Sequence, residues 1–125
     1  MILGIGADLL ETGRVRHELG RSQWLPDDGI FTPEEISDCS SAARPALGFA
    51  ACFAAKEAAL KALGMPVTDL GLFREVTVAH DDRGRRRVMF SGRLKAESDR
   101  LGVRNIKLSL VYNPRQTCAI IILES

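Results

Sequence analysis

The sequence predicts a single α+β domain in which a mainly antiparallel sheet packs against a long central helix. An alanine-rich segment in the middle of the chain, from Pro45 to Leu63, is long enough to supply that helix. In the second half, apolar and polar residues alternate in short runs separated by turn-forming residues, which is typical of antiparallel hairpins. Helices and strands do not follow one another in a regular strand-helix-strand order, so a parallel sheet is not expected.

The composition fits one such domain and argues against several classes of protein. A chain of 125 residues, 46% of them hydrophobic, can bury its own core, and we expect one domain over residues 1–125. The formal charge of +1 gives no field that would attract nucleic acid or an anionic membrane. The first residues form neither a signal peptide nor a membrane span, so we expect a cytoplasmic protein. Cys39, Cys52 and Cys118 lack a C-x-x-C spacing, and ordinary packing of reduced thiols explains them best.

The chain opens with a predicted strand, Ile2 to Asp8. Because side chains alternate along a strand, Gly4 and Gly6 lie on the same face as Asp8. Two glycines beside a carboxylate allow a helix or a ligand to approach the backbone closely.

Two shorter helices are predicted before the long one. Glu11–Leu19 reads as a short helix. Thr32 caps the next helix, with Pro33 at its first position and Glu35 completing a capping box. The long helix then ends at Gly64.

The rest of the chain is predicted to form a strand pair, a helix and a closing hairpin. Residues 81–84 make the first turn and Asn113-Pro114 the second. The elements are the strands Phe73–His80 and Arg85–Phe90, the helix Gly92–Leu101, the strand Ile106–Tyr112 and the apolar run Cys118–Leu123.

Glu57 has an unusual position on the long helix. At about 100° per residue, Phe49, Phe53 and Leu60 fall within a narrow apolar stripe, and Glu57 lies about 40° from its centre. Lys61 follows one turn later and projects toward the same rim. The simpler interpretation is an exposed ion pair between Glu57 and Lys61.

A second interpretation pairs Glu57 with Asp8. Two carboxylates from separate elements, each beside small residues, could jointly hold Mg²⁺. This ion prefers oxygen ligands and is commonly bound by one or two carboxylates together with substrate phosphates. From the residues alone, both interpretations stay open.

Four segments, spread over nearly the whole chain, resemble the holo-acyl-carrier-protein synthase family of phosphopantetheinyl transferases and occur in that family's order. They are G-I-G-A-D-L-L-E-T-G-R-V at the start, T-P-E-E-I, F-A-A-K-E-A-A-L-K-A-L-G from Phe53 to Gly64, and the closing hairpin. The third segment is specific to phosphopantetheinyl transferases. The resemblance implies a magnesium-dependent homotrimer that moves the phosphopantetheinyl group of coenzyme A to a serine of acyl carrier protein.

The resemblance also implies roles for individual residues. Asp8 and Glu57 are expected to bind Mg²⁺ with the coenzyme A pyrophosphate, and Lys61 to neutralise or protonate the leaving adenosine bisphosphate. Lys56, Arg85 and Ser109 are expected to contact the coenzyme. Each site is expected to lie between neighbouring subunits, and the arginines that follow the first strand, Arg14 and Arg21, to dock the acidic recognition helix of the carrier protein.

The chain departs from the family pattern at several positions. Where the family reads Ser-x-Ser/Thr-His, this chain has Ser109-Leu110-Val111-Tyr112, and Cys52 replaces the arginine that usually precedes Phe53. Tyr112 thus takes the catalytic position of a histidine, although a phenol with a pKa of about 10 is a poor base at neutral pH. Three functions stay open: a working transferase, a relative that uses Tyr112 on a charged carrier protein or a coenzyme A thioester, and a binding module without catalysis.

Overall fold

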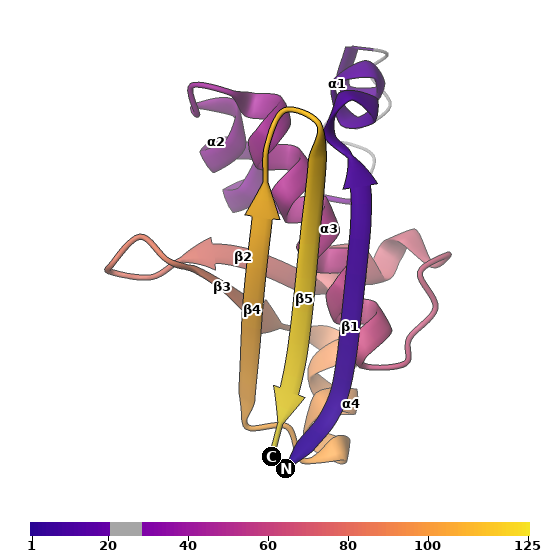
Figure 1. The fold of residues 1–125 in the computed structure, drawn as a ribbon. Coiled ribbons are helices and arrows are strands. Elements are labelled where there is room, and N and C mark those ends of the chain that lie inside the picture. The colour runs from indigo at the N-terminus through magenta and orange to yellow at the C-terminus, as the bar shows by residue number, and fades with distance from the viewer. Residues whose placement is uncertain (21–28) are drawn as a thin grey trace.

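The computed structural model describes residues 1–20 and 29–125, and its α+β architecture confirms the predicted fold class (Figure 1). The two termini lie side by side at one end of the main sheet (Figure 1), where the Ser125 amide donates to the Met1 carbonyl at 3.0 Å. The elements in chain order are β1 (Ile2–Glu11), α1 (Thr12–Gly20), α2 (Pro33–Ser40), α3 (Pro45–Ala62), the 3₁₀ helix η2 (Leu70–Glu75), β2 (Val76–His80), β3 (Arg86–Phe90), α4 (Gly92–Leu101), β4 (Asn105–Tyr112) and β5 (Gln116–Glu124).

Three strands form the main sheet in the order β1-β5-β4, and both pairings are antiparallel. The predicted closing hairpin is confirmed: the Asn113 side chain accepts hydrogen bonds from the amides of Arg115 and Gln116, which closes the turn between β4 and β5. The register sets Asp8 of β1 opposite Ala119 of β5. Strands β2 and β3 pair separately and project from the body as a hairpin (Figure 1).

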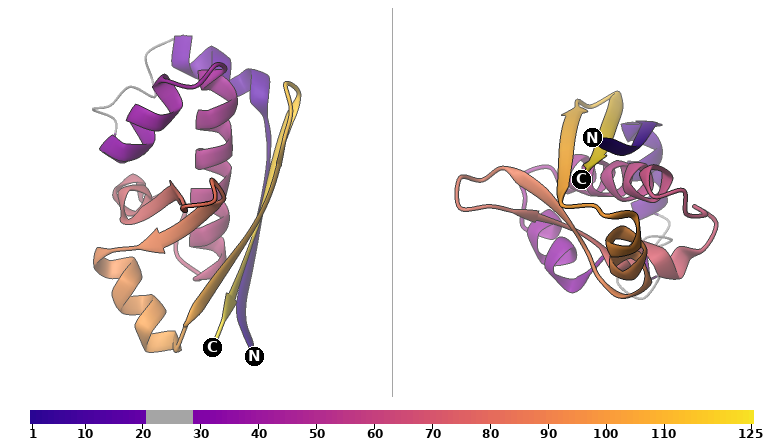
Figure 2. Two further views of the ribbon diagram at one scale, coloured as in Figure 1. Left: turned by 90° about the vertical axis from the view of Figure 1, so that its left-hand side faces the viewer. Right: turned by 90° about the horizontal axis from the view of Figure 1, so that it is seen from below.

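Helix α3 lies between the main sheet and a second layer that contains α2, η2 and β2 (Figure 2). Because two layers cover this helix, the prediction of a single apolar stripe is wrong. Phe53 and Glu57 are only half-buried, whereas small side chains on several sides of the helix have no exposed surface. Alanine suits a helix that two layers must approach closely. The fully buried alanines of α3 are Ala50, Ala51, Ala54, Ala55, Ala58 and Ala59.

The predicted capping box begins α2. Thr32 Oγ1 accepts from the Glu35 amide at 3.3 Å, and Glu35 Oε1 accepts from the Thr32 amide at 2.8 Å. Glu35 Oε2 also accepts from the Val78 amide at 2.8 Å, so this one carboxylate ties α2 to β2.

The sequence predicts that this strand begins at Phe73, but β2 begins at Val76. Asp69 accepts a hydrogen bond from the Gly71 amide at 3.1 Å and thereby starts the 3₁₀ turn of η2, which takes up Phe73. Phe73 remains buried there, and its ring stacks on that of Phe53 at 5.4 Å. Within residues 1–20 and 29–125, no helix is both long and apolar enough to cross a membrane.

Candidate active site

Two glycines bring β1 against α3 and set the position of Asp8. A Cβ on Gly4 would lie 2.2 Å from the carbonyl oxygen of Ala62, and a Cβ on Gly6 would lie 1.9 Å from that of Ala58. Any side chain larger than hydrogen would push the strand away from the helix. Asp8 shares this inward face of β1, so its carboxylate is held next to α3. The predicted approach of a helix to these glycines is confirmed.

Asp8 is buried, and its two oxygens have different surroundings. Lys61 Nζ donates to Asp8 Oδ1 at 3.2 Å and to the carbonyl of Ala7 at 3.2 Å. The ion pair therefore joins helix to strand, unlike the Glu57–Lys61 pair of the simpler interpretation. Asp8 Oδ2 is buried and, with the carboxyls of Asp8 and Glu57 both ionised, has no hydrogen-bond partner in the part of the chain that the structure describes.

Glu57 lies beside Asp8 and is affected by it. The pKa of Glu57 is raised, first by its burial and then by the negative charge of Asp8 and a hydrogen bond that only a protonated carboxyl can donate to it. The ammonium of Lys61 opposes part of this shift. Two carboxylates and one ammonium thus meet where β1 crosses α3.

The residues at this crossing fit magnesium. Both carboxylates supply the hard oxygen ligands that Mg²⁺ prefers, and a bound cation would satisfy Asp8 Oδ2 and relieve the repulsion between Asp8 and Glu57. Among the described residues, no group of three or more His, Cys, Asp or Glu side chains is placed to hold a metal. Magnesium does not require one, because water and substrate phosphates commonly complete its coordination.

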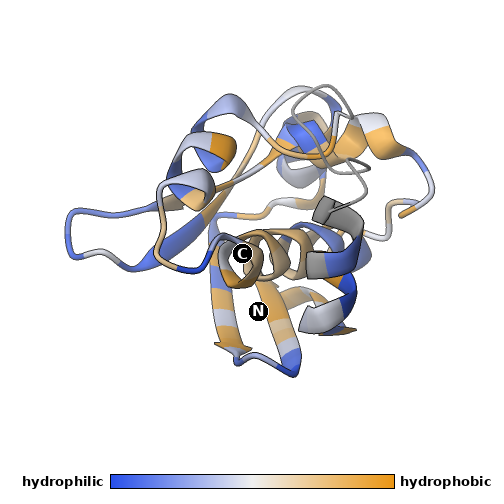
Figure 3. Ribbon diagram, turned by 90° about the horizontal axis from the view of Figure 1, so that it is seen from above, coloured by the Kyte–Doolittle hydropathy of each residue, from blue (hydrophilic) through white to orange (hydrophobic). Residues whose placement is uncertain are grey.

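A second group of predicted residues surrounds a cavity of about 610 Å³ between the β2–β3 hairpin and β4. The guanidinium of Arg86 lies over the ring of Tyr112, with Cζ 5.1 Å from the ring centroid. Arg85 Nε donates to Asp81 Oδ2 at 3.0 Å near the tip of the hairpin, which is strongly hydrophilic (Figure 3). Four cationic side chains contribute to the lining and suit an anionic ligand. They are Arg85, Arg86, Arg87 and Lys107.

These two groups lie apart within one chain. Asp8 is on β1 and Tyr112 on β4, at opposite edges of the main sheet with β5 between them (Figure 1). At the usual strand spacing, about 10 Å separate the two edge strands. Neither Glu57 nor Lys61 lines the cavity that Arg85 and Tyr112 share.

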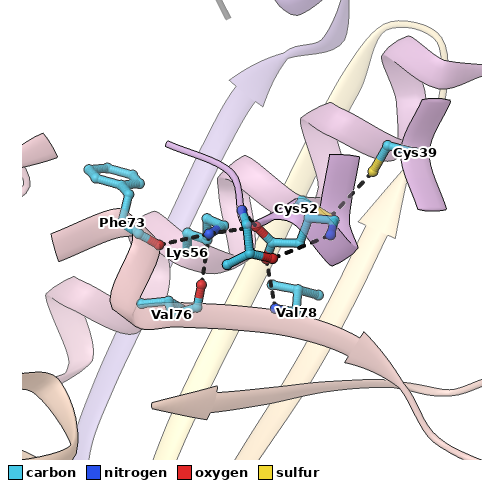
Figure 4. A network of polar contacts seen from close by, with 8 residues as sticks. Cys39, Cys52, Lys56, Phe73, Val76 and Val78 are labelled. Carbon is cyan, nitrogen blue, oxygen red and sulfur yellow. Dashed lines mark hydrogen bonds and ion pairs between the residues drawn. The ribbon is translucent and has the colours of Figure 1, made fainter. Parts of the chain in front are cut away.

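Lys56 lies in the core, and the expectation that it contacts the coenzyme is wrong. Its side chain is 0% exposed, and Nζ lies 2.6 Å from Glu35 Oε1. Nζ also donates to the carbonyls of Phe73 and Val76, both at 2.7 Å, so the ammonium joins α3 to η2 and β2 (Figure 4). Burial lowers the pKa of Lys56, and Glu35 opposes this shift by stabilising the charged form.

The remaining predicted residues are at the surface or outside the described chain. Ser109 is exposed and pairs with Ile120, which in turn pairs with Ala7 on the outer face of the sheet, opposite to that of Asp8. Arg14 is exposed on α1. Arg21 lies outside the described residues.

Sequence reasoning missed Arg86, although a signal was present. Arg86 shares the inward face of β3 with Val88 and Phe90, so the alternation of that strand directs one arginine of the Arg85-Arg86-Arg87 run inward. Its Nη1 is buried and has no hydrogen-bond partner among residues 1–20 and 29–125.

Known proteins of similar sequence share one family with this chain. A sequence model of the 4'-phosphopantetheinyl transferase superfamily matches residues 4–119. A holo-acyl-carrier-protein synthase of Koribacter versatilis is 36% identical over 124 residues, covering 99% of each chain. One of Vibrio parahaemolyticus is 35% identical over 124 residues, covering 99% of this chain and 98% of the other.

Solved structures agree with these sequences. The crystal structure of holo-acyl-carrier-protein synthase from Neisseria meningitidis superposes with a TM-score of 0.87 at 28% identity, covering 100% of both chains. The structure of the Bacillus anthracis protein, in complex with CoA (3',5'-ADP), superposes with a TM-score of 0.78 at 28% identity, covering 100% of this chain and 98% of that chain. The resemblance that the sequence motifs indicate is confirmed over nearly the full length, and the chain belongs to the 4'-phosphopantetheinyl transferase superfamily.

Proposed function

We propose that this chain transfers the phosphopantetheinyl group of coenzyme A to a serine of an apo-acyl carrier protein, in a magnesium-dependent reaction that releases adenosine 3',5'-bisphosphate. The observation that carries the proposal is the meeting of Asp8, Glu57 and Lys61 where β1 crosses α3, in a member of this superfamily. Two hard anionic ligands beside a cation suit a substrate that carries a pyrophosphate.

The reaction needs alignment and charge stabilisation more than covalent participation of the protein. The serine hydroxyl attacks the β-phosphorus, the bond to the adenosine bisphosphate oxygen breaks, and the serine proton passes to solvent. When bound, Mg²⁺ would neutralise charge on the pyrophosphate. Asp8 and Glu57 would hold that ion, and the ammonium of Lys61, whose side chain is 41% exposed, would stabilise the charge that develops on the leaving group.

We assign Tyr112 a positioning role. Its phenol is a poor base at neutral pH, whereas its ring supports the guanidinium of Arg86 at the edge of the cationic cavity. Arginine binds phosphate groups through its planar fork of N–H donors, so Arg86 and Arg85 would bind phosphates of coenzyme A.

A homotrimer with shared sites would account for the separation of the two groups of residues. Side chains on the outer face of the sheet leave an apolar surface in solvent: Ile5 is 61% exposed, Leu9 66% and Val111 66%. Exposed apolar surface of this kind is typical of an interface between proteins. If this face packs against a second copy, Asp8 of one subunit would approach the cationic cavity of its neighbour, and Ser109 would lie in the interface.

The carrier protein would bind at the end of the sheet that carries α1. Arg14 is exposed there and would pair with acidic side chains of the carrier, and Arg21 joins it in this proposal by resemblance alone. Charge reversal by Arg14→Glu would raise KM for the carrier, whereas Arg104→Glu, at the opposite end of the sheet, would not. A cytoplasmic setting is part of the proposal, because three unbridged cysteines suit a reducing compartment.

The test is incubation with apo-carrier protein, coenzyme A and Mg²⁺, followed by intact mass spectrometry of the carrier. The expected result is addition of phosphopantetheine by the wild type and its loss in Asp8→Asn and Glu57→Gln, with Asp99→Asn, an exposed carboxylate on α4, as the matched control. Binding of coenzyme A without any addition across diverse carriers would instead indicate a binding module.

Mixing two inactive variants tests the shared site. Asp8→Asn and Arg86→Ala lie in different groups, so a mixed trimer would contain some interfaces with both wild-type halves. Recovery of activity on mixing supports the shared site. If native mass spectrometry shows mixed trimers and activity stays absent, the site is not shared in this way.

A further inference from the structure

Two of the three cysteines lie together between α2 and α3, outside the proposed transferase site. The Sγ atoms of Cys39 and Cys52 are 3.7 Å apart, and the thiols share a hydrogen bond (Figure 4). Gly48 permits this approach, because a Cβ there would lie 3.3 Å from Cys39 Sγ. We propose that Cys39 and Cys52 form a site of reversible oxidation, at which a peroxide converts the two thiols to an intramolecular disulfide that joins α2 to α3.

The geometry requires only a small movement. A disulfide bond is about 2.05 Å long, so the two sulfurs have to approach by about 1.7 Å from their present separation. Rotation of two short side chains on adjacent helices can supply much of this. Cys118 cannot substitute for either partner, because it lies on the outer face of the main sheet, where it pairs with Leu9 and Val111.

A small oxidant has room beside the pair. Both cysteines are 4% exposed, yet they line a cavity of about 170 Å³. A water molecule occupies about 30 Å³ in the liquid, so a peroxide fits this space. Bulkier thiol reagents would be excluded by the low exposure of the sulfurs.

The charges around this cavity give the two thiols different roles. Arg86 lines it as well as the larger cavity, and its buried Nη1 has no hydrogen-bond partner among the described residues. The pKa of Cys39 is lowered, first by the hydrogen bond from Cys52 and also by Arg86, against the opposing effects of burial and of Glu35 and Asp38. The same hydrogen bond, with burial, raises the pKa of Cys52.

One further titratable side chain faces this cavity. His80 of β2 lines it as well and lies 3.7 Å from Asp38. We assign the attack on the peroxide to Cys39 and the resolving step to Cys52, an order that the single cysteine variants test.

The chemistry balances with a peroxide as the oxidant. The Cys39 thiolate attacks one peroxide oxygen, a sulfur–oxygen bond forms, the oxygen–oxygen bond breaks, and the departing hydroxide takes a proton to become water. Cys52 sulfur then attacks Cys39 sulfur, the disulfide forms, and the sulfenic hydroxyl leaves with the Cys52 proton as a second water. Two thiols lose two electrons, and hydrogen peroxide is reduced to two waters.

The test treats the reduced wild-type protein with hydrogen peroxide, unfolds it in urea, alkylates the remaining thiols and maps the peptides without reduction. The expected product is a cross-linked pair of peptides that contain Cys39 and Cys52, lighter by two hydrogens and separated again by dithiothreitol. The proposal is overturned if Cys118 alone is oxidised, or if Cys39 proceeds to sulfinic acid while Cys52 remains alkylatable.

Single variants test the order of attack. In Cys52→Ser, a sulfenic acid on Cys39 has no resolving thiol and should be trapped when the oxidised protein is unfolded in urea with dimedone, whereas in Cys39→Ser the label should be absent from Cys52. Cys118→Ser is the matched control and should form the cross-link at the wild-type rate. Label on Cys52 in Cys39→Ser at the rate seen for Cys39 would reverse the assignment.

The pH dependence separates an activated thiol from a merely buried one. The oxidation rate of Cys39 in the native protein should reach half its plateau at a lower pH than that of the same cysteine in urea-unfolded protein, because only the thiolate reacts. Arg86→Met should move the native profile toward the unfolded one and slow oxidation at neutral pH. Coincident native and unfolded profiles would contradict activation of Cys39.

Discussion

Gly6 lies so close to α3 that a Cβ added to it would be 1.9 Å from the carbonyl oxygen of Ala58. This contact fixes the separation of β1 and α3, and therefore the position of Asp8 relative to Glu57. The bare backbone of one residue thus controls whether two carboxylates can share an ion.

Gly6→Ala should lower both the free energy of unfolding and magnesium binding. The added methyl group has to displace the strand from the helix, which costs about 1–3 kcal/mol. Gly13→Ala is the control, since a Cβ there meets nothing within 4 Å and alanine suits its helix, so stability should be unchanged or slightly raised. Urea denaturation of each variant, with and without Mg²⁺, measures its stability and its stabilisation by the ion. Equal midpoints for the two variants would contradict the expected clash at Gly6.

Lys56→Met should destabilise the protein strongly without weakening the affinity of the folded fraction for coenzyme A. Removal of the ammonium leaves the Glu35 carboxylate buried without its ion pair, which typically costs about 3–5 kcal/mol. Lys95→Met removes an exposed partner of Asp99 and should change stability by less than about 1 kcal/mol. Denaturation curves measure the stability of each variant, and titration calorimetry measures its affinity for coenzyme A. A loss of coenzyme affinity at unchanged stability would restore Lys56 to the binding site.

The sequence predicts best those features that depend on neighbours in the chain. The capping box at Thr32, the hairpin turn at Asn113 and the glycine face that carries Asp8 each follow from short patterns with a direct physical cause. The motif from Phe53 to Gly64 likewise predicts the family, which the full-length matches confirm.

The features that the sequence could not predict depend on tertiary contacts between elements that are distant in the chain. Periodicity detects burial against one layer, so it missed that α3 is covered from two sides and that its partner layer encloses Lys56. The partner of Lys56 is Glu35, and the local pattern explains Glu35 fully as a capping residue. The pairing of Cys39 with Cys52 likewise arises only when α2 packs on α3.

Glu57 should make the stability of the metal-free protein depend on pH. Its pKa is raised in the folded state, first by burial and then by Asp8, so the folded protein binds this proton more tightly than the unfolded chain. That contribution to stability is present below the ordinary value of 4.5 and is lost as the pH rises through the raised pKa. Glutamine stays neutral and can donate a hydrogen bond to Asp8. In EDTA at neutral pH, Glu57→Gln should therefore have a higher Tm than the wild type, with a smaller difference in acid.

Magnesium should make the Tm of the wild type higher than that of Glu57→Gln. Added Mg²⁺ should raise the Tm of the wild type, because it binds the folded state, and should raise that of Glu57→Gln much less. Glu34→Gln, an exposed carboxylate on α2, is the control and should respond as the wild type does. Calorimetric scans with and without the ion measure the effect, and equal shifts in the wild type and Glu57→Gln would remove Glu57 from the metal site.

Tyr112→Phe should leave turnover and KM for coenzyme A unchanged, whereas Tyr112→Ala should raise that KM. Phenylalanine keeps a ring under Arg86, and alanine removes it. A cation–π contact contributes about 0.5–2 kcal/mol, which corresponds to roughly twofold to thirtyfold in affinity. Steady-state kinetics across pH distinguish this from acid or base catalysis by the phenol: Tyr112→Phe would then lower kcat and remove one limb of the pH–rate profile. Because the hydroxyl is the only group that Tyr112→Phe deletes, an unchanged profile assigns the function of Tyr112 to its ring, and through the ring to the position of Arg86.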